Sequence, residues 1–146
     1  FPTELFDETG ARMRSIGHEY GAVTGRERRC GWLDLVALKY SIMINGVTQL
    51  IMMKSDVLDG FDTIKACVAY KKDGVVMEDM PFETEGCEAV YKELPGWKED
   101  LSHMTDESQF PQTFKDYIRF LETELETPIT ILSVGPDRAQ TIVRKK

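Results

Sequence analysis

The chain has 146 residues, of which 42% are hydrophobic, so it is long enough to form one domain with a hydrophobic core. Eighteen Lys and Arg residues against 25 Asp and Glu residues give a net charge of −7, which argues against a surface built to bind nucleic acid or an anionic membrane. Cys30, Cys67 and Cys87 have no C-x-x-C spacing, and no apolar run approaches the ~18 residues that cross a bilayer. These features exclude a disulfide framework and a membrane-spanning chain, and they predict a cytosolic setting.

The predicted elements alternate between helix and strand. Residues 32–44 are apolar on nearly every face and run into Asn45-Gly46, a pair that suits a left-handed helix end, so they predict a buried helix. Apolar positions recur at helical spacing over residues 114–125 behind Pro111, which suits a first helical turn because it has no N–H to satisfy. Asp73-Gly74 marks a hairpin. Short apolar runs predict strands at residues 49–53, 64–70, 75–77 and 129–132. This alternation predicts the α/β class.

The segment from Gly21 to Gly31 carries three arginines, Arg26, Arg28 and Arg29, between glycines. The planar guanidinium group of arginine can meet two oxygens of a carboxylate or phosphate, and glycines leave backbone N–H groups accessible to an anion. The segment therefore predicts an anion-binding loop. Alternatively, the arginines are solvated or paired with the acidic surplus of the chain.

Two further segments follow predicted strands. In Lys54-Ser55-Asp56, the carboxylate could accept hydrogen bonds from N1–H and the exocyclic amine of guanine while the lysine stem lies over the ring. In Ser133-Val134-Gly135-Pro136, the glycine lets the backbone approach a ligand and the proline stiffens the turn. Ligands of α/β sheets gather beyond the carboxyl ends of strands, so the two segments are expected to share a site. On spacing alone, an ordinary turn or helix cap is the favoured explanation of each segment.

Other residues are predicted to be structural. His18 and His103 have no partner at metal-ligand spacing, so we expect them on the surface and expect no metal site in this chain. Trp97 is predicted to anchor a loop by packing. Three methionines are expected in the core: Met43, Met52 and Met53.

Six short motifs are distributed along nearly the whole chain. They are Phe1-Pro2-Thr3-Glu4, Gly25-Arg26-x-Arg28-Arg29-x-Gly31-Trp32-Leu33-Asp34, Lys54-x-Asp56-Val57-Leu58-Asp59, Cys67-Val68-Ala69-Tyr70, Leu94-Pro95-Gly96-Trp97 and Ser133-Val134-Gly135-Pro136-Asp137-Arg138. Together they resemble the adenylosuccinate synthetase family. The resemblance implies that residues 1–146 are a single C-terminal fragment of that fold, with mixed sheet strands, one buried helix and one amphipathic helix.

In that family, GTP phosphorylates the 6-oxygen of inosine monophosphate (IMP), with Mg²⁺ neutralising the transferred phosphate, and the amine of L-aspartate then displaces the phosphate. The resemblance therefore implies a cytoplasmic, homodimeric ligase of AMP biosynthesis with no nucleic-acid or membrane partner. It also implies that the phosphate loop, the Mg²⁺ ligands and the catalytic Asp and His lie upstream of this chain. We therefore expect no catalytic or metal-binding residue here, and an inactive fragment.

The resemblance further implies two groups of binding residues. Those for L-aspartate and IMP would be Val23, Thr24, Gly25, Arg26 and Arg28. Arg26 and Arg28 would hold the aspartate carboxylates, Thr24 would add a hydroxyl contact, and Arg26 would approach the IMP ribose. Those for GTP would be Arg28, Lys54, Ser55, Asp56, Ser133, Val134, Gly135 and Pro136.

Two positions depart from the family pattern, and two other functions remain as alternatives. Val23 stands where many relatives have Thr, and Glu27 interrupts a more basic run, which weakens the local positive potential unless Glu27 points to solvent. The first alternative is a free-standing guanine-nucleotide-binding module that never catalyses. The second is an RNA-binding domain that uses the three arginines, for which retention on RNA would depend steeply on salt.

Overall fold

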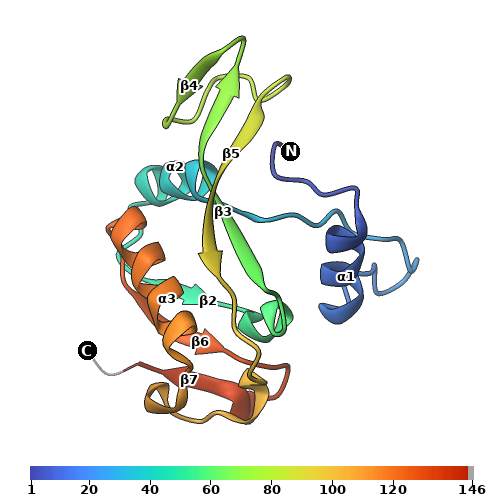
Figure 1. Cartoon of the computed structure of the whole chain (residues 1–146), viewed down its shortest axis with the longest axis vertical. Coiled ribbons are helices and arrows are strands. Elements are labelled where there is room, and N and C mark those ends of the chain that lie inside the picture. Colours follow the sequence, from blue (N-terminus) through green and yellow to red (C-terminus); the bar gives the residue numbers. More distant parts are fainter. Residues whose placement is uncertain (145–146) are drawn as a thin grey trace. The chain divides into compact units, whose positions relative to one another are not determined.

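The computed structural model describes residues 1–144 (Figure 1), so residues 145 and 146 of the predicted fragment 1–146 lie outside the described residues. The chain divides into two compact units. The first unit combines Phe1–Tyr40 with Lys65–Glu93, and the second combines Ser41–Ile64 with the chain from Leu94 onward. Both contain helix and strand, which confirms the α/β class.

The first unit begins with helix α1, Glu8–Ile16, whose N-terminus is capped by the Asp7 carboxylate at 3.1 Å from the Gly10 N–H. Its sheet is built on the long strand β3, drawn in green in Figure 1. The strands of this sheet are β1 (Leu33–Asp34), β3 (Thr63–Lys72), β4 (Val75–Met77) and β5 (Glu88–Pro95). Strand β1 pairs with β3 in parallel, β4 pairs with it antiparallel, and β5 is also its neighbour. Asp73 and Gly74 form the turn between β3 and β4, which confirms the predicted hairpin.

The core of the first unit lies against β3. Val36, Cys67 and Tyr70 are each at most 1% exposed, and half-buried apolar side chains from the following hairpin pack on them. Burial raises the pKa of the Cys67 thiol to about 11, so this cysteine is a protonated, apolar core residue. Burial also raises the pKa of Tyr70, whose hydroxyl donates a hydrogen bond to the Asp34 carboxylate.

Helix α2, Leu35–Asn45, differs from its prediction. Only Leu35 and Val36 are buried, whereas Met43 is 68% exposed and Ile44 60% exposed. The expectation of a helix buried on nearly every face is therefore wrong for these residues, because apolar composition does not determine which elements cover a face. Gly46 has φ +59° and ends the helix in the left-handed conformation, as Asn45-Gly46 predicted.

The second unit contains a three-stranded sheet of β2 (Leu50–Met52), β6 (Ile129–Ser133) and β7 (Thr141–Val143). Strands β2 and β6 are parallel, and β6 and β7 form an antiparallel pair. Helix α3, Gln112–Leu125, buries residues at the spacing that the sequence predicted. They are Phe114, Tyr117, Ile118, Leu121 and Leu125. The predicted amphipathic helix and the two predicted strands are confirmed. Met53 is 66% exposed, so its predicted core position, like that of Met43, is wrong.

Short 3₁₀ helices connect these elements: η1 (Ser55–Leu58), η2 (Leu101–His103), η3 (Glu107–Gln109) and η4 (Arg138–Gln140). Trp97 is 1% exposed, its ring centroid lies 4.6 Å from that of Phe114, and its indole N–H donates to the Asp59 carboxylate at 2.6 Å. This confirms Trp97 as a packed anchor. His18 and His103 are exposed, as predicted. Within residues 1–144, no helix has both the length and the apolar character needed to cross a membrane.

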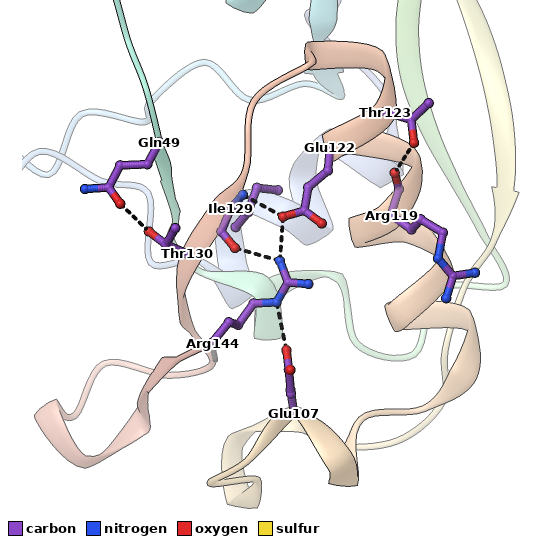
Figure 2. A network of polar contacts seen from close by, with 8 residues as sticks. All are labelled: Gln49, Glu107, Arg119, Glu122, Thr123, Ile129, Thr130 and Arg144. Carbon is purple, nitrogen blue, oxygen red and sulfur yellow. Dashed lines mark hydrogen bonds and ion pairs between the residues drawn. The ribbon is translucent and has the colours of Figure 1, made fainter. Parts of the chain in front are cut away.

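Arg144 joins three elements of the second unit (Figure 2). Its Nε donates to Glu107 at 2.9 Å, and one terminal nitrogen donates to Glu122 at 2.7 Å and to the Ile129 carbonyl at 2.6 Å. Burial alone would lower the pKa of Arg144, but the hydrogen bonds to Glu122 and Glu107 outweigh it and raise the pKa. The guanidinium therefore stays charged and connects the end of β7 to η3, α3 and β6.

Candidate functional site

The two segments predicted to share a site leave neighbouring strands of the second unit. Met52 of β2 is paired with Leu132 of β6 in a parallel register. Because parallel strands have their carboxyl ends at the same edge, the segment after β2 and the segment after β6 emerge side by side. We define the sheet-edge site as seven residues of these segments. They are Lys54, Ser55, Asp56, Ser133, Val134, Gly135 and Pro136.

The first half of the sheet-edge site presents polar atoms that the protein does not use. Lys54 has a left-handed backbone, with φ 57°, and directs the chain into η1. The Ser55 hydroxyl and one carboxylate oxygen of Asp56 are buried, and no hydrogen-bond partner for them exists within residues 1–144. A buried polar atom without a partner costs about 1–3 kcal/mol, and such atoms in native folds commonly mark a place for a ligand or water. Asp56 therefore offers an unused acceptor at this edge.

The second half of the sheet-edge site is held by its own hydrogen bonds. The Ser133 hydroxyl donates to the Gly135 carbonyl at 2.9 Å, so it is committed to the loop. The Val134 N–H donates to the Gln140 carbonyl at 2.9 Å. For the Gly135 N–H, by contrast, no acceptor is found in the described part of the chain. The loop thus combines a fixed backbone with an available donor.

Asp59 supports the first half, and the sequence analysis did not assign it a role. Its two carboxylate oxygens accept from the Trp97 indole N–H at 2.6 Å and from the Leu101 backbone N–H at 2.9 Å. Burial raises the pKa of Asp59, although both hydrogen bonds oppose that shift. No local pattern signals this role, because both partners lie about forty residues away, at sequence separations of 38 and 42.

The predicted anion-binding loop lies in the first unit. We call residues Gly21–Arg29 the arginine loop. The Gly21 N–H donates to the Arg26 carbonyl at 2.8 Å, and the Gly25 N–H donates to the Gly21 carbonyl at 2.9 Å, so the loop closes on itself. The Thr24 hydroxyl accepts from the Arg26 N–H at 3.3 Å, and Val23 is 97% exposed. The loop is therefore shaped by local hydrogen bonds and presents its tip to solvent.

The three arginines of this loop differ in their partners. Arg28 pairs with Glu19 at 2.9 Å, and Arg29 pairs with Glu4. The hydrogen bond from Arg29 lowers the pKa of the Glu4 carboxyl. The guanidinium group of Arg26 has no ion pair or hydrogen bond to any of residues 1–144. Pairing with acidic side chains thus accounts for two of the arginines, and Arg26 retains a free fork.

Glu27, the departure from the basic run, is 68% exposed and lies 3.4 Å from the guanidinium group of Arg14. Arg14 also donates from Nε to the Arg28 carbonyl at 2.9 Å, which ties the arginine loop to helix α1. The charge of Glu27 is therefore directed to Arg14 and to solvent, so it opposes the loop's positive potential less than its sequence position suggests.

Two further observations concern other kinds of site. Among residues 1–144, no group of three or more His, Cys, Asp and Glu side chains could hold a metal ion. A cavity of about 490 Å³ lies in the second unit beside Arg144, lined by residues that include Glu107, Lys115 and Glu122. None of the predicted site residues lines this cavity. Among the charged groups of its wall, Arg144 already forms ion pairs with Glu107 and Glu122.

The fold and the sheet-edge site define an α/β protein with a candidate binding edge, and comparison with known proteins gives its family. The adenylosuccinate synthetase family model matches residues 1–142, and the chain belongs to this family of purine-biosynthesis ligases. Curated adenylosuccinate synthetases from Phocaeicola vulgatus and Bacteroides thetaiotaomicron are 70% and 68% identical to it over 145 residues. These matches cover 99% of this chain and 34% of each relative.

A solved structure agrees with this assignment. The fully ligated adenylosuccinate synthetase from Plasmodium falciparum is similar with a TM-score of 0.94 and 40% identity, over 99% of this chain and 36% of that one. The chain therefore spans about a third of the length of the relatives it matches.

Proposed function

We propose that this chain is part of a GTP-dependent ligase that joins IMP and L-aspartate to give adenylosuccinate, GDP and phosphate, and that its sheet-edge site holds the guanine base. The observation that carries the proposal is the buried, unpartnered carboxylate oxygen of Asp56 at the edge where β2 and β6 end together. Membership of the synthetase family supports the reaction.

The groups of the sheet-edge site complement guanine. The Asp56 carboxylate would accept from N1–H and from the exocyclic amine, and the free Gly135 N–H would donate to O6. The stem of Lys54 would cover the ring face. Adenine has no N1–H and carries a donor where guanine has O6, so both contacts would be lost and buried polar groups left unpaired. The site would therefore select GTP over ATP.

The arginine loop would bind L-aspartate. Arg26, which has no partner among the described residues, would grip one carboxylate and approach the IMP ribose, and the Thr24 hydroxyl and the Val23–Gly25 backbone would complete the contact. Arg28 would bind the second carboxylate of L-aspartate, either by giving up its ion pair with Glu19 or by contacting these two carboxylates at once. This exchange is cheap, because an exposed ion pair contributes only about 0–1 kcal/mol. We further propose that Arg28 contacts GTP, as the family resemblance implies.

Phosphoryl transfer would rest on parts of the synthetase outside these residues. Mg²⁺ bound elsewhere in the synthetase would supply electrostatic stabilisation of the transferred phosphate, and the residues proposed here would bind and orient the base and the amino acid. The chain alone would then be inactive, and the whole enzyme would work as a cytoplasmic homodimer.

Replacing Asp56 by Asn in the complete synthetase tests the guanine site. One acceptor becomes a misplaced donor, so we expect kcat/KM for GTP to fall about 100-fold while that for ATP stays low, which collapses the selectivity. Initial rates of adenylosuccinate formation with each nucleotide measure this. Asp62→Asn is the matched control, because the Asp62 carboxylate is 91% exposed and pairs with Lys98.

Unchanged selectivity for GTP over ATP in Asp56→Asn would contradict the guanine site. Binding of GTP by the complete protein without adenylosuccinate formation would instead favour a nucleotide-binding module. Inosine triphosphate, which lacks only the exocyclic amine, separates the two Asp56 contacts: it should lose less from the substitution than GTP does.

A further inference from the structure

The second unit contains the same four-residue capping arrangement twice. Asp106 caps η3 and Asp137 caps η4, and in each case the aspartate side chain accepts a backbone N–H two residues on, at 2.9 Å and 3.2 Å. In each, the last residue is a glutamine whose side-chain oxygen accepts the aspartate N–H, at 3.2 Å for Gln109 and 2.8 Å for Gln140. The capping itself is therefore a local stabilising device common to both.

Gln140 makes contacts beyond this common arrangement. Its side-chain nitrogen donates to the Ser102 carbonyl at 3.0 Å, and its backbone carbonyl accepts from Val134 at 2.9 Å. Its carboxamide lies directly against Gly135, where an added Cβ would collide with it. Among the described residues, by comparison, the donors to the side-chain oxygen of Gln109 all lie in its own segment, in Thr105 and Asp106.

The contact with Ser102 leads to the other half of the sheet-edge site. Ser102 lies in η2, whose first residue, Leu101, donates its N–H to Asp59 at 2.9 Å. The N–H of Asp59 in turn donates to the Asp56 carbonyl at 3.1 Å. Hydrogen bonds and short backbone steps thus connect Asp56 with Gly135, and Gln140 is the side chain that closes the connection.

We infer that Gln140 is a positioning residue that fixes the Gly135 N–H relative to the Asp56 carboxylate and so sets the contact to O6 of the guanine base. The inference rests on the proposed guanine site. Gln140 acts through the backbone, because its own carboxamide is already occupied by Asp137 and Ser102. Without the Gln140 side chain, the loop of Val134 and Gly135 loses the hydrogen bond to the Ser102 carbonyl that holds it against η2.

Gln140→Ala in the complete synthetase tests this, with Gln109→Ala as the matched control. Both substitutions remove the glutamine of a capping box, so both should lower the melting temperature by a similar amount. Only Gln140→Ala should raise KM for GTP, by about five- to tenfold, the range of one misplaced hydrogen bond. The KM values for IMP and L-aspartate, and kcat at saturating GTP, should stay within about twofold of the wild type.

Two further measurements separate positioning from general loosening. Gln140→Glu keeps the acceptor for Asp137 but loses the donor to Ser102, so it should raise KM for GTP as Gln140→Ala does. 6-Thioguanosine triphosphate keeps N1–H and the amine but replaces O6 by a weaker acceptor. Gln140→Ala should therefore raise KM for this analogue by about twofold or less over the wild type, because the contact to the Gly135 N–H is already weak in the wild type.

The outcomes are distinct. The inference is overturned if Gln140→Ala folds like Gln109→Ala and leaves KM for GTP unchanged, or if it raises KM for all three substrates alike. An equal rise for GTP and its 6-thio analogue also overturns it. Failure of the proposed guanine site looks different: the wild type would not prefer GTP to ATP, and Asp56→Asn would change nothing.

Discussion

The arginine loop and the sheet-edge site use opposite ways of preparing a binding surface. The arginine loop is exposed, is shaped by its own backbone hydrogen bonds, and keeps Arg28 and Arg29 paired with glutamates. The sheet-edge site begins where two paired strands end, and it leaves a buried carboxylate oxygen of Asp56 without a partner among residues 1–144. Two of the three arginines in the loop are paired before any ligand arrives, whereas the sheet-edge site holds a buried acceptor for which the described residues supply no partner.

The two regions therefore differ in the free-energy cost of binding a ligand. A ligand that reaches Arg28 must displace its ion pair with Glu19, which is weak because water screens it, whereas Arg26 has no ion pair to displace among the described residues. A ligand at the sheet-edge site would meet a buried Asp56 oxygen that has no partner among the described residues, and its affinity depends on how rigidly the acceptor and donor are held. Substitutions in the loop should therefore change substrate affinity with little effect on folding, whereas those behind the sheet-edge site should change both.

The largest expected effect separates the two arginines of the proposed aspartate site. Arg26→Leu should raise KM for L-aspartate about 100-fold, because none of the described residues competes for its guanidinium and its charge-assisted bonds would go to the substrate. Arg28→Leu should raise it about tenfold, since Glu19 already competes for that guanidinium. Steady-state kinetics with varied L-aspartate and saturating GTP and IMP measure both values.

Arg29→Leu provides the control within the same loop, because Arg29 is paired with Glu4 and lies over the Phe1 ring. It should leave KM for L-aspartate within about twofold. If Arg28→Leu proves as severe as Arg26→Leu, or if GTP is affected as strongly as L-aspartate in Arg26→Leu, the distinction between free and paired arginines is wrong.

The next effect tests the support behind the sheet-edge site. Asp59→Ala leaves the Trp97 indole N–H and the Leu101 N–H without an acceptor, so it should lower the free energy of unfolding by about 2 kcal/mol and raise KM for GTP. Urea unfolding of the complete synthetase measures the first quantity. Asp62→Ala, at an exposed carboxylate, should change it by less than about 0.5 kcal/mol.

The pH dependence of the same substitution has a defined sign. Burial raises the pKa of Asp59 in the folded protein above its ordinary value, so the folded state binds this proton more readily than the unfolded state. Protonation of Asp59 therefore contributes to the free energy of unfolding. This contribution is complete at pH values below the pKa of Asp59 in the unfolded chain, and it is lost as the pH rises through the pKa of Asp59 in the folded protein. The stability difference between wild type and Asp59→Ala should therefore shrink with rising pH across this window, and a difference that grows would contradict the burial effect.

The smallest expected effect compares a half-buried ion pair with an exposed one. Arg144→Met leaves Glu107 and Glu122 facing each other without the guanidinium, and should cost about 1–2 kcal/mol of unfolding free energy. Arg119→Ala removes an exposed pair with Asp116 on α3 and should cost less than about 0.5 kcal/mol. Equal losses in thermal unfolding would mean that burial does not distinguish these pairs.

Much of the fold follows from local patterns in the sequence. The apolar spacing from Phe114 to Leu125 encodes the buried face of α3, and Asp73-Gly74 encodes the hairpin turn, because each depends on residues within one element. The edge shared by Lys54-Ser55-Asp56 and the Ser133 segment was also predictable, since parallel strands end at a common edge.

The remaining features depend on partners distant in the chain. The exposure of Met43 could not be predicted, because the composition of α2 does not say which elements cover it. Asp59 finds its acceptor role only when Trp97 and Leu101 fold beside it. The pairing of Arg28 with Glu19, against the freedom of Arg26, likewise depends on loop geometry, although both residues have the same sequence signal.

The close approach of Gln140 to Gly135 has a consequence for how this segment can evolve. A methyl group at position 135 would displace the carboxamide and break its bonds to Asp137 and Ser102, whereas a shorter residue at position 140 would make room for it. The two positions are thus coupled, and the acceptability of a change at one depends on the residue already present at the other.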